Sequence, residues 1–409
     1  MNSNLLVVHG GAPTAVMNAS LYGVIRSAQK SGEVDKVLGA RGGSQAMLKG
    51  DFVDLSALDE QTLALLPSTP ASYIGTSRYP LEETDYEKII EVLLSQRIDC
   101  VLFNGGNGTM DACGKLARAI AHTPRSRHIR VIGIPKTVDN DIAVTDHAPG
   151  FGSAARYLAA SVAELACDIA SLPIHVCIIE SMGRNTGWLT AAAALAHPLG
   201  PHLIYVPEIP FDEEQFLDEA KTLFDRIGGV VVVASEGLKK KDGSLLVPPV
   251  FKTGRSVYYG DVSSYLSSIV IKRLGIKARN EKPGILGRCS IAHQSALDRE
   301  EAILAGSEAV KAALSGCTAV MVGFKRLSSI PYRAETVYIP IEDVMLHERT
   351  LPEEYVNTER NGIRRSFLEW CRPLIGGPLA LFAQPAALSS AHTLIMKPIA
   401  EGKRNGSST

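Results

Sequence analysis

The sequence lacks paired cysteines, a surplus of charge of one sign and any long apolar run. Its seven cysteines are scattered, with no CxxC pair and an odd total, which fits reduced thiols and argues against a disulfide framework. A formal net charge of -1 provides no general basic surface for nucleic acid or acidic membrane. No apolar run approaches the roughly 18 residues of a membrane helix, and the N-terminus has no signal-peptide pattern. We therefore expect a cytoplasmic protein with no nucleic-acid or membrane partner.

The chain does have length and a regular alternation of segments. Its 409 residues, 45% of them apolar and 21% charged, are enough for two compact domains. Short apolar runs alternate with helical stretches, and this alternation predicts an α/β fold with parallel sheets covered by helices on both faces. The predicted strands are 5–8, 101–103, 131–134, 176–179, 203–206 and 230–233.

The loop after the predicted strand 131–134 carries a lysine, a hydroxyl and two carboxylates. Residues 135–141 read PKTVDND. Ligands of open α/β sheets bind at the carboxyl ends of the strands. A carboxylate there can act as a general base or help to hold a metal, and a lysine can neutralise phosphate. The same composition also occurs in an Asx-rich turn that only caps the next helix.

Two glycine-rich turns occupy the same position between a predicted strand and a predicted helix. Residues 104–109 read NGGNGT, ahead of a helix at 110–120, and residues 10–14 read GGAPT. Adjacent glycines let the backbone approach a ligand closely, and a helix N-terminus offers N–H groups to an anion. The first turn is neither a Rossmann fingerprint nor a Walker A loop, because Asp111 and Leu116 stand where Gly and Ser or Thr are required. Both turns are compatible with phosphate, as they are with a plain tight connection.

A fourth segment places an arginine between glycines after the predicted strand 176–179. Residues 180–188 read ESMGRNTGW, with Arg184 at the centre. A guanidinium in this position suits bidentate binding of a phosphate or carboxylate. A surface arginine that caps a helix is the alternative.

Together these segments resemble the phosphofructokinase family, and specifically its pyrophosphate-dependent branch. The matching segments follow the family's order from about residue 5 to residue 376. They are GGAPTAVMNAS near the N-terminus, YIGTSR from Tyr73, GGNGTMDA from Gly105, GIPKTVDNDI from Gly133, ESMGRNTGW from Glu180, YVPE from Tyr205, ASEG from Ala234 and GRCS from Gly287.

The resemblance implies two doubly wound α/β domains with mainly parallel sheets. Residues 1–150 and 290–355 would bind the phosphoryl donor, and residues 151–289 and 356–409 the sugar phosphate. Because the sugar-phosphate site of the family is shared between subunits, the resemblance also implies a homodimer or homotetramer. The polar tail 400–409 is expected to be disordered.

The activity that the resemblance implies is a reversible, Mg²⁺-dependent phosphoryl transfer from pyrophosphate to the 1-hydroxyl of fructose 6-phosphate. Such a transfer needs positioning, charge neutralisation and a group that deprotonates the attacking hydroxyl. Asp139 matches the family's base, and Thr137, Asp141 and Arg184 match the catalytic residues around it. The acceptor contacts match Thr137, Asp139, Met182, Gly183, Arg184, Glu236 and, near the distal phosphate of the sugar, Arg288. The donor contacts match Gly11, Arg78, Gly106, Asn107, Gly108, Thr109 and Lys136.

Two positions bear on the choice of donor. ATP-dependent members of the family carry glycine where this chain has Lys136, whose side chain would fill the space of a nucleotide α-phosphate. Many pyrophosphate-dependent members carry an acidic residue where this chain, like the ATP enzymes, has Gly108. The size and charge of Lys136 favour pyrophosphate, with ATP as the alternative.

The chain departs from the family pattern in three places. Asn107 replaces the aspartate that supports magnesium, although an amide oxygen can still orient a magnesium-bound water. The N-terminal glycine loop, which begins at Gly10 and is called the first glycine loop below, is one residue longer than usual. His175 stands where bacterial ATP enzymes place an arginine that reaches the neighbouring subunit's sugar phosphate. Sedoheptulose 7-phosphate or another sugar therefore stays open as the acceptor.

A non-catalytic regulatory subunit is the competing class. Such chains of the family tend to lose the base or the arginines, whereas Asp139, Asp141, Arg184 and Glu236 are all present here.

Overall fold

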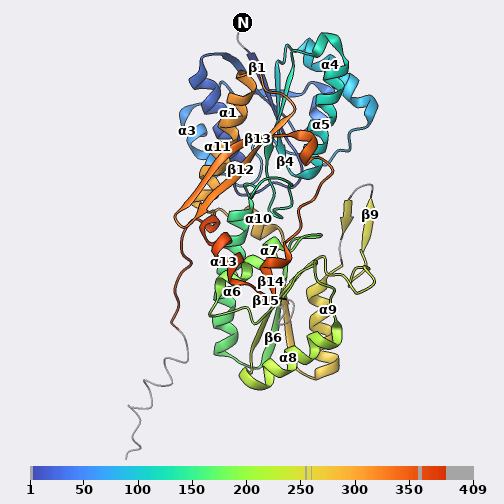
Figure 1. The fold of residues 1–409 in the computed structure, drawn as a ribbon, viewed down its shortest axis with the longest axis vertical. Helices are drawn as coiled ribbons and strands as arrows, with labels where there is room; N and C mark the ends of the chain where they lie inside the picture. Colours follow the sequence, from blue (N-terminus) through green and yellow to red (C-terminus); the bar gives the residue numbers. More distant parts are fainter. Residues whose placement is uncertain (1–2, 254–255, 259, 358–361, 384–409) are drawn as a thin grey trace, which may run out of the picture.

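The computed structural model describes residues 3–253, 256–258, 260–357 and 362–383, which form two lobes stacked along the long axis of the molecule (Figure 1). The first lobe holds a seven-stranded sheet in the order β13-β12-β5-β4-β1-β2-β3. Its inner strands pair in parallel, and the outer strands β3 and β13 pair antiparallel with their neighbours. The strands are β1 (Ser3–His9), β2 (Val34–Ala40), β3 (Phe52–Asp54), β4 (Cys100–Gly105), β5 (Arg130–Pro135), β12 (Val320–Ser329) and β13 (Tyr332–Pro340).

Helices cover both faces of this sheet because its inner strands are nearly continuous apolar runs, which places apolar side chains on both faces. Leu6 and Val8 of β1 pack in one core with residues of α4 and α5, while Leu5 and Val7 pack in another with residues of α1 and α11. The four helices are α1 (Met17–Ser31), α4 (Glu83–Ser95), α5 (Asn107–His122) and α11 (Ala296–Leu314).

The second lobe holds a four-stranded parallel sheet in the order β11-β6-β8-β7. Cys177 and Ile179 of β6 face a core with residues of α6, α7 and α13, and Val176 and Ile178 face a core with α8 and α9. The strands are β6 (His175–Ser181), β7 (Leu203–Tyr205), β8 (Val230–Ser235) and β11 (Lys277–Glu281). The helices are α6 (Phe151–Ser171), α7 (Trp188–Ala192), α8 (Glu213–Ile227), α9 (Val262–Ile269) and α13 (Arg365–Cys371).

Shorter elements connect these layers. The short helices are α2 (Ser44–Lys49), α3 (Glu60–Leu65), α10 (Ile285–Cys289) and α12 (Ile341–Val344), and the short strands are β9 (Phe251–Thr253), β10 (Ser256–Tyr258), β14 (Val356–Asn357) and β15 (Gly362–Ile363). Single 3₁₀ turns and one π turn complete the path: η1 (Leu66–Ser68), η2 (Pro124–Ser126), η3 (Ala193–Ala196), η4 (Val270–Leu274, the π turn), η5 (Glu353–Tyr355) and η6 (Arg372–Ile375). Within the described ranges, none of the helices has the length and apolar character needed to cross a membrane.

The structure confirms the α/β fold with mainly parallel sheets and all six predicted strands. One prediction was wrong in detail. The turn expected at 104–109 is shorter, because β4 runs to Gly105 and α5 begins at Asn107, so that Gly108 and Thr109 lie in the first turn of a helix. The tail 400–409 lies outside the described residues, and the domain boundaries stay a prediction.

Candidate functional site

A cleft of about 780 Å³ opens where the carboxyl ends of β1, β4 and β5 face the loops after β6 and β8. The predicted site residues line this cleft with one exception, and they come from both lobes: Gly11, Arg78, Gly106, Asn107, Gly108, Thr109, Lys136, Thr137, Asp139, Asp141, Met182, Arg184, Glu236 and Arg288. The exception is Gly183. Its φ of +124° and the 2.5 Å that would separate a Cβ there from the Thr186 carbonyl oxygen make it a residue of the turn rather than of the cleft wall.

The donor side of the cleft is built around the first turn of α5. A Cβ at Gly10 would lie 2.2 Å from Oγ1 of Thr109, and one at Gly105 would lie 2.1 Å from it, so both glycines make room for this threonine. A Cβ at Gly108 would meet nothing within 4 Å. The N-terminus of a helix with an open approach to its first turn is a favourable place for an anion.

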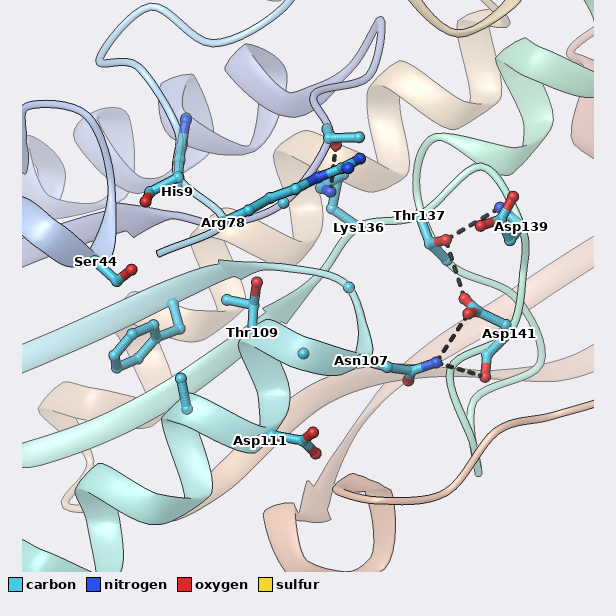
Figure 2. A pocket seen from close by; sticks show the side chains of 18 of the residues that line it. His9, Ser44, Arg78, Asn107, Thr109, Asp111, Lys136, Thr137, Asp139 and Asp141 are labelled. Carbon is cyan, nitrogen blue, oxygen red and sulfur yellow. Dashed lines mark hydrogen bonds between the residues drawn. The ribbon is translucent and has the colours of Figure 1, made fainter. Parts of the chain in front are cut away.

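Lys136 is buried beneath the donor side, with 3% of its surface exposed. Its Nζ donates a hydrogen bond of 2.6 Å to the carbonyl oxygen of Ala12, in the first glycine loop. Arg78 extends toward it from the opposite wall (Figure 2). Burial lowers the pKa of Lys136 to about 8, although Asp139 and Asp141 act in the other direction. The two carboxylates thus compensate the burial of the ammonium only in part, which favours an incoming anion.

A chain of hydrogen bonds joins the two aspartates to Asn107 (Figure 2). Thr137 Oγ1 donates to Asp141 Oδ1 at 3.0 Å and accepts from the backbone N–H of Asp139 at 3.0 Å. Asn107 Nδ2 donates to Asp141 Oδ2 at 2.9 Å and to the Asp141 carbonyl oxygen at 3.2 Å. Each carboxylate oxygen of Asp141 thus has a donor, whereas Oδ1 of Asp139 is buried without a hydrogen-bond partner among the described residues.

The two carboxylates have raised pKa values. Burial, followed by the negative charges of Asp141 and Glu236, raises the pKa of Asp139 to about 7. Burial also raises the pKa of Asp141, against the hydrogen bond from Thr137. Asp139 lines the cleft, titrates near neutrality and keeps an oxygen without a hydrogen-bond donor among the described residues, which are properties of a general base.

The acceptor side consists of the loops after β6 and β8. Arg184 Nε lies 3.8 Å from Glu236 Oε1, and the two residues form an ion pair in the wall of the cleft. Arg288 is half-buried, and its Nε has no hydrogen-bond partner among the described residues. Burial and the nearby charge of Arg78 lower the pKa of Arg288. His175 lies at the start of β6 and does not line the cleft.

Sequence reasoning missed several residues of the cleft wall. Asn185 and Thr186 follow Arg184, and Thr186 Oγ1 donates to the carbonyl oxygen of Asp139 at 3.0 Å. Glu348 accepts from Asn185 Nδ2 at 3.0 Å and comes from a segment without any glycine-rich or motif signal. The position of Asn185 and Thr186 next to Arg184 was a usable signal, whereas Glu348 had none.

The residues fit a magnesium ion that is bound in part by its substrates. Asn107 Oδ1 is buried and lacks a hydrogen-bond partner among the described residues, so it can accept a hydrogen bond from a metal-bound water. The described residues include no group of three or more His, Cys, Asp or Glu side chains suited to a metal. Mg²⁺ commonly takes one or two protein ligands and completes its shell with water and phosphate oxygens, which fits this arrangement.

The comparisons with known proteins agree with this geometry. The sequence matches the family model described as "Phosphofructokinase" over residues 4–313. The chain belongs to the phosphofructokinase family. It is 38% identical over 397 residues to a pyrophosphate–fructose 6-phosphate 1-phosphotransferase of Xanthomonas campestris pv. campestris, with 93% of each chain covered. It is 32% identical over 375 residues to a sulfofructose kinase of Alkalicoccus urumqiensis, with 90% of this chain and 94% of that enzyme covered.

A solved structure of the family extends the match to the fold. The crystal structure of a pyrophosphate-dependent phosphofructokinase from Nitrosospira multiformis superposes with a TM-score of 0.84 at 31% identity, covering 94% of this chain and 95% of that one. The phosphofructokinase-like fold predicted from the motifs is therefore confirmed.

Proposed function

We propose that this protein transfers a phosphoryl group reversibly from pyrophosphate to the 1-hydroxyl of fructose 6-phosphate, giving fructose 1,6-bisphosphate and phosphate. Relatives and a solved neighbour that match over more than nine-tenths of the chain carry names with this activity. The observation that carries the choice of donor is Lys136, which is buried under the donor side and tied to Ala12 of the first glycine loop.

We assign the proton transfer to Asp139. It takes the proton of the acceptor hydroxyl, the hydroxyl oxygen attacks the terminal phosphorus of pyrophosphate, and the bond to the bridging oxygen breaks as phosphate leaves. Thr137 and Asp141 hold the loop that carries Asp139, and Arg184 neutralises charge on the phosphoryl group during its transfer. Its ion pair with Glu236, at 3.8 Å, is loose enough to open toward a ligand.

Donor binding is assigned to Gly11, Gly106, Gly108, Thr109, Arg78 and Lys136, in the unit of residues 1–150 and 290–355. Acceptor binding is assigned to Met182, Gly183, Glu236 and Arg288, in the unit of residues 151–289 and 356–409. Mg²⁺, when bound, would neutralise phosphate charge, and Asn107 would hold it through a water. We also propose that the protein forms a homodimer or a homotetramer.

A matrix of donors and acceptors tests the proposal. Purified protein with magnesium is assayed with pyrophosphate, ATP and ADP against fructose 6-phosphate, sedoheptulose 7-phosphate, sulfofructose and free sugars. We expect the highest kcat/KM for pyrophosphate with fructose 6-phosphate. A preference for ATP would overturn the donor, a preference for sulfofructose or sedoheptulose 7-phosphate would overturn the acceptor, and silence with every pair would favour a regulatory subunit.

A further inference from the structure

A segment from the C-terminal part of the chain borders the cleft and contacts both of its sides. We call residues 345–351, between α12 and η5, the strap. On the donor side, the Leu346 N–H donates to Asp111 Oδ1 of α5 at 2.8 Å. On the acceptor side, Glu348 accepts from Asn185, the residue after Arg184, and the Leu351 N–H donates to Glu208 Oε1, after β7, at 2.8 Å. The strap is thus fastened to both lobes.

Arg349, in the middle of the strap, contacts the loop of the two aspartates. Its backbone N–H donates to the Asp141 carbonyl oxygen at 2.8 Å. Its Nη1 donates to the Thr145 carbonyl oxygen at 2.6 Å and also to the carbonyl oxygen of Asp146. Three carbonyl oxygens in the stretch 141–146 are therefore held by this one residue.

The other face of Arg349 rests on the acceptor lobe. Its guanidinium carbon lies 4.1 Å from the ring centroid of Trp188, and Trp188 Nε1 donates back to the Arg349 carbonyl oxygen at 3.3 Å. Trp188 is fully buried and begins α7, directly after the loop that carries Arg184 and Thr186. Arg349 therefore lies between the loop of Asp139 and the loop of Arg184.

The environment of this guanidinium argues against a role in stability alone. Arg349 has no ion pair with any described carboxylate, and burial lowers its pKa to about 10. A partly buried charge that is held by carbonyl dipoles and aromatic rings, with Asp146 nearby, gains little net stability from its burial. Backbone strain also occurs in both segments that this contact joins, since Val144 in the stretch 141–146 and Leu346 in the strap have φ values of 68° and 66°.

We propose that Arg349 is a positioning residue that holds the loop of the base in register with the acceptor loop. The inference rests on the proposed function, because it assigns Asp139 and Arg184 to the reaction. Arg349 does not line the cleft and touches neither substrate, so its effect must pass through residues 141–146 and Trp188. A shift of the base by about 1 Å can cost on the order of a hundredfold in rate.

The test compares Arg349→Met and Arg349→Lys with the wild-type enzyme and with Arg130→Met. Arg130 serves as a control, because its Nη1 also donates to backbone, to the carbonyl oxygen of Ala313 at 2.8 Å, but it lies away from the strap and the cleft. For Arg349→Met we expect kcat to fall by roughly ten- to a hundredfold, with the KM for pyrophosphate changed less than about threefold. Arg349→Lys should regain much of kcat, because an ammonium can donate to the same carbonyls and lie over the ring.

The melting temperature separates positioning from stability. We expect Arg349→Met and Arg130→Met to melt within a few degrees of each other, while only the former loses kcat. An Arg349→Met enzyme with kcat within twofold of the wild type would overturn the inference, as would an equal loss in Arg130→Met. The proposed function fails separately, if the wild type does not use pyrophosphate and fructose 6-phosphate. The kcat of each variant relative to the wild type is then measured with whichever donor and acceptor are active. Absence of activity with every donor and acceptor would contradict both proposals.

Discussion

At the scale of single residues, the site depends on one unsatisfied oxygen and one buried cation. Asp139 Oδ1 is buried without a hydrogen-bond partner among the described residues, while each oxygen of Asp141 has a donor. This difference distinguishes the two carboxylates, since both oxygens of Asp141 are held by donors, whereas Asp139, which lines the cleft, keeps an oxygen without one among the described residues. Among the described residues, the side chain of Lys136 donates its hydrogen bond to a neutral carbonyl, so its charge remains available to a donor.

The first prediction concerns the base. Asp139→Asn keeps the shape and the backbone contacts of the loop but cannot take a proton, so kcat should fall by roughly 10²- to 10⁴-fold with the melting temperature nearly unchanged. In the wild type, kcat should rise with pH and level off above about 7, because the raised pKa of Asp139 must be passed before the base is ionised. Asp146 cannot replace Asp139 as the base, because its carboxylate lies outside the cleft. Near-normal turnover of Asp139→Asn would exclude this mechanism.

The second prediction separates the charge of Lys136 from its volume. Lys136→Met removes the charge and keeps the stem, whereas Lys136→Gly removes both. Both variants should raise the KM for pyrophosphate by about ten- to a hundredfold, since a charge-assisted contact contributes roughly 1.5–3 kcal/mol. Only Lys136→Gly should gain activity with ATP, because only this variant opens space for a nucleotide. Equal ATP activity in both variants, or unchanged pyrophosphate kinetics, would refute the donor argument.

The sequence was sufficient for most of these residues but not for their partners. Short motifs at strand ends predicted the residues of the cleft wall, because parallel strands bring their carboxyl ends to one edge of a sheet. The bond from Asn107 to Asp141 joins positions 34 residues apart and could not be read from composition. Glu348 and Arg349 lie in a segment whose sequence has no loop motif, and only the folded chain brings them behind Asp141.

At the scale of elements, a buried cluster fastens the loop 136–150 to the surrounding helices and strands. His147 Nδ1 is 2.8 Å from Asp146 Oδ2, and its Nε2 is 2.7 Å from Glu301 Oε2 of α11. Asp146 also accepts from Arg326 of β12 at 3.0 Å and from Trp370 of α13 at 3.1 Å. The loop therefore has an anchor of its own, on the side opposite to the cleft residues.

The third prediction uses the charge of this cluster. Burial acts against protonation, but the charges of Glu301 and Asp146 outweigh it and raise the pKa of His147 to about 9. Because the folded pKa exceeds the unfolded value of about 6.5, the stabilisation is complete below pH 6.5 and is lost as the pH rises through 9. The shift corresponds to about 3 kcal/mol. The melting temperature of the wild type should fall between pH 7 and 9, and that of His147→Gln should fall much less; parallel curves would contradict the assignment.

Some strands were not predicted from the sequence, and each of these omissions has a physical reason. β11 reads KARNE and lies at the edge of its sheet, so it lacks the apolar run by which the other strands were recognised. β12 and β13 form a long antiparallel pair with many exposed positions, so they lack the continuous burial of the inner strands. Buried parallel strands are the elements that a single sequence predicts best.

At the scale of the whole molecule, the reacting groups come from two lobes and meet only in the cleft between them. Lys136 and Asp139 follow β5 of the first sheet, whereas Arg184 and Glu236 follow β6 and β8 of the second. The hydrogen bond from Thr186 to the Asp139 carbonyl oxygen and the strap are the described contacts that join the two sets. Under the proposed function, donor and acceptor would approach from opposite lobes, which is compatible with an in-line transfer.

The reverse reaction is the most direct test of the central claim, that pyrophosphate is the phosphoryl donor. Fructose 1,6-bisphosphate, phosphate, magnesium and the enzyme are incubated without any nucleotide, and the products are followed by phosphorus NMR. We expect pyrophosphate and fructose 6-phosphate to appear together, in equal amounts and at a rate comparable to that of the forward reaction. If no pyrophosphate forms, and the forward reaction proceeds with ATP alone, the claim is wrong.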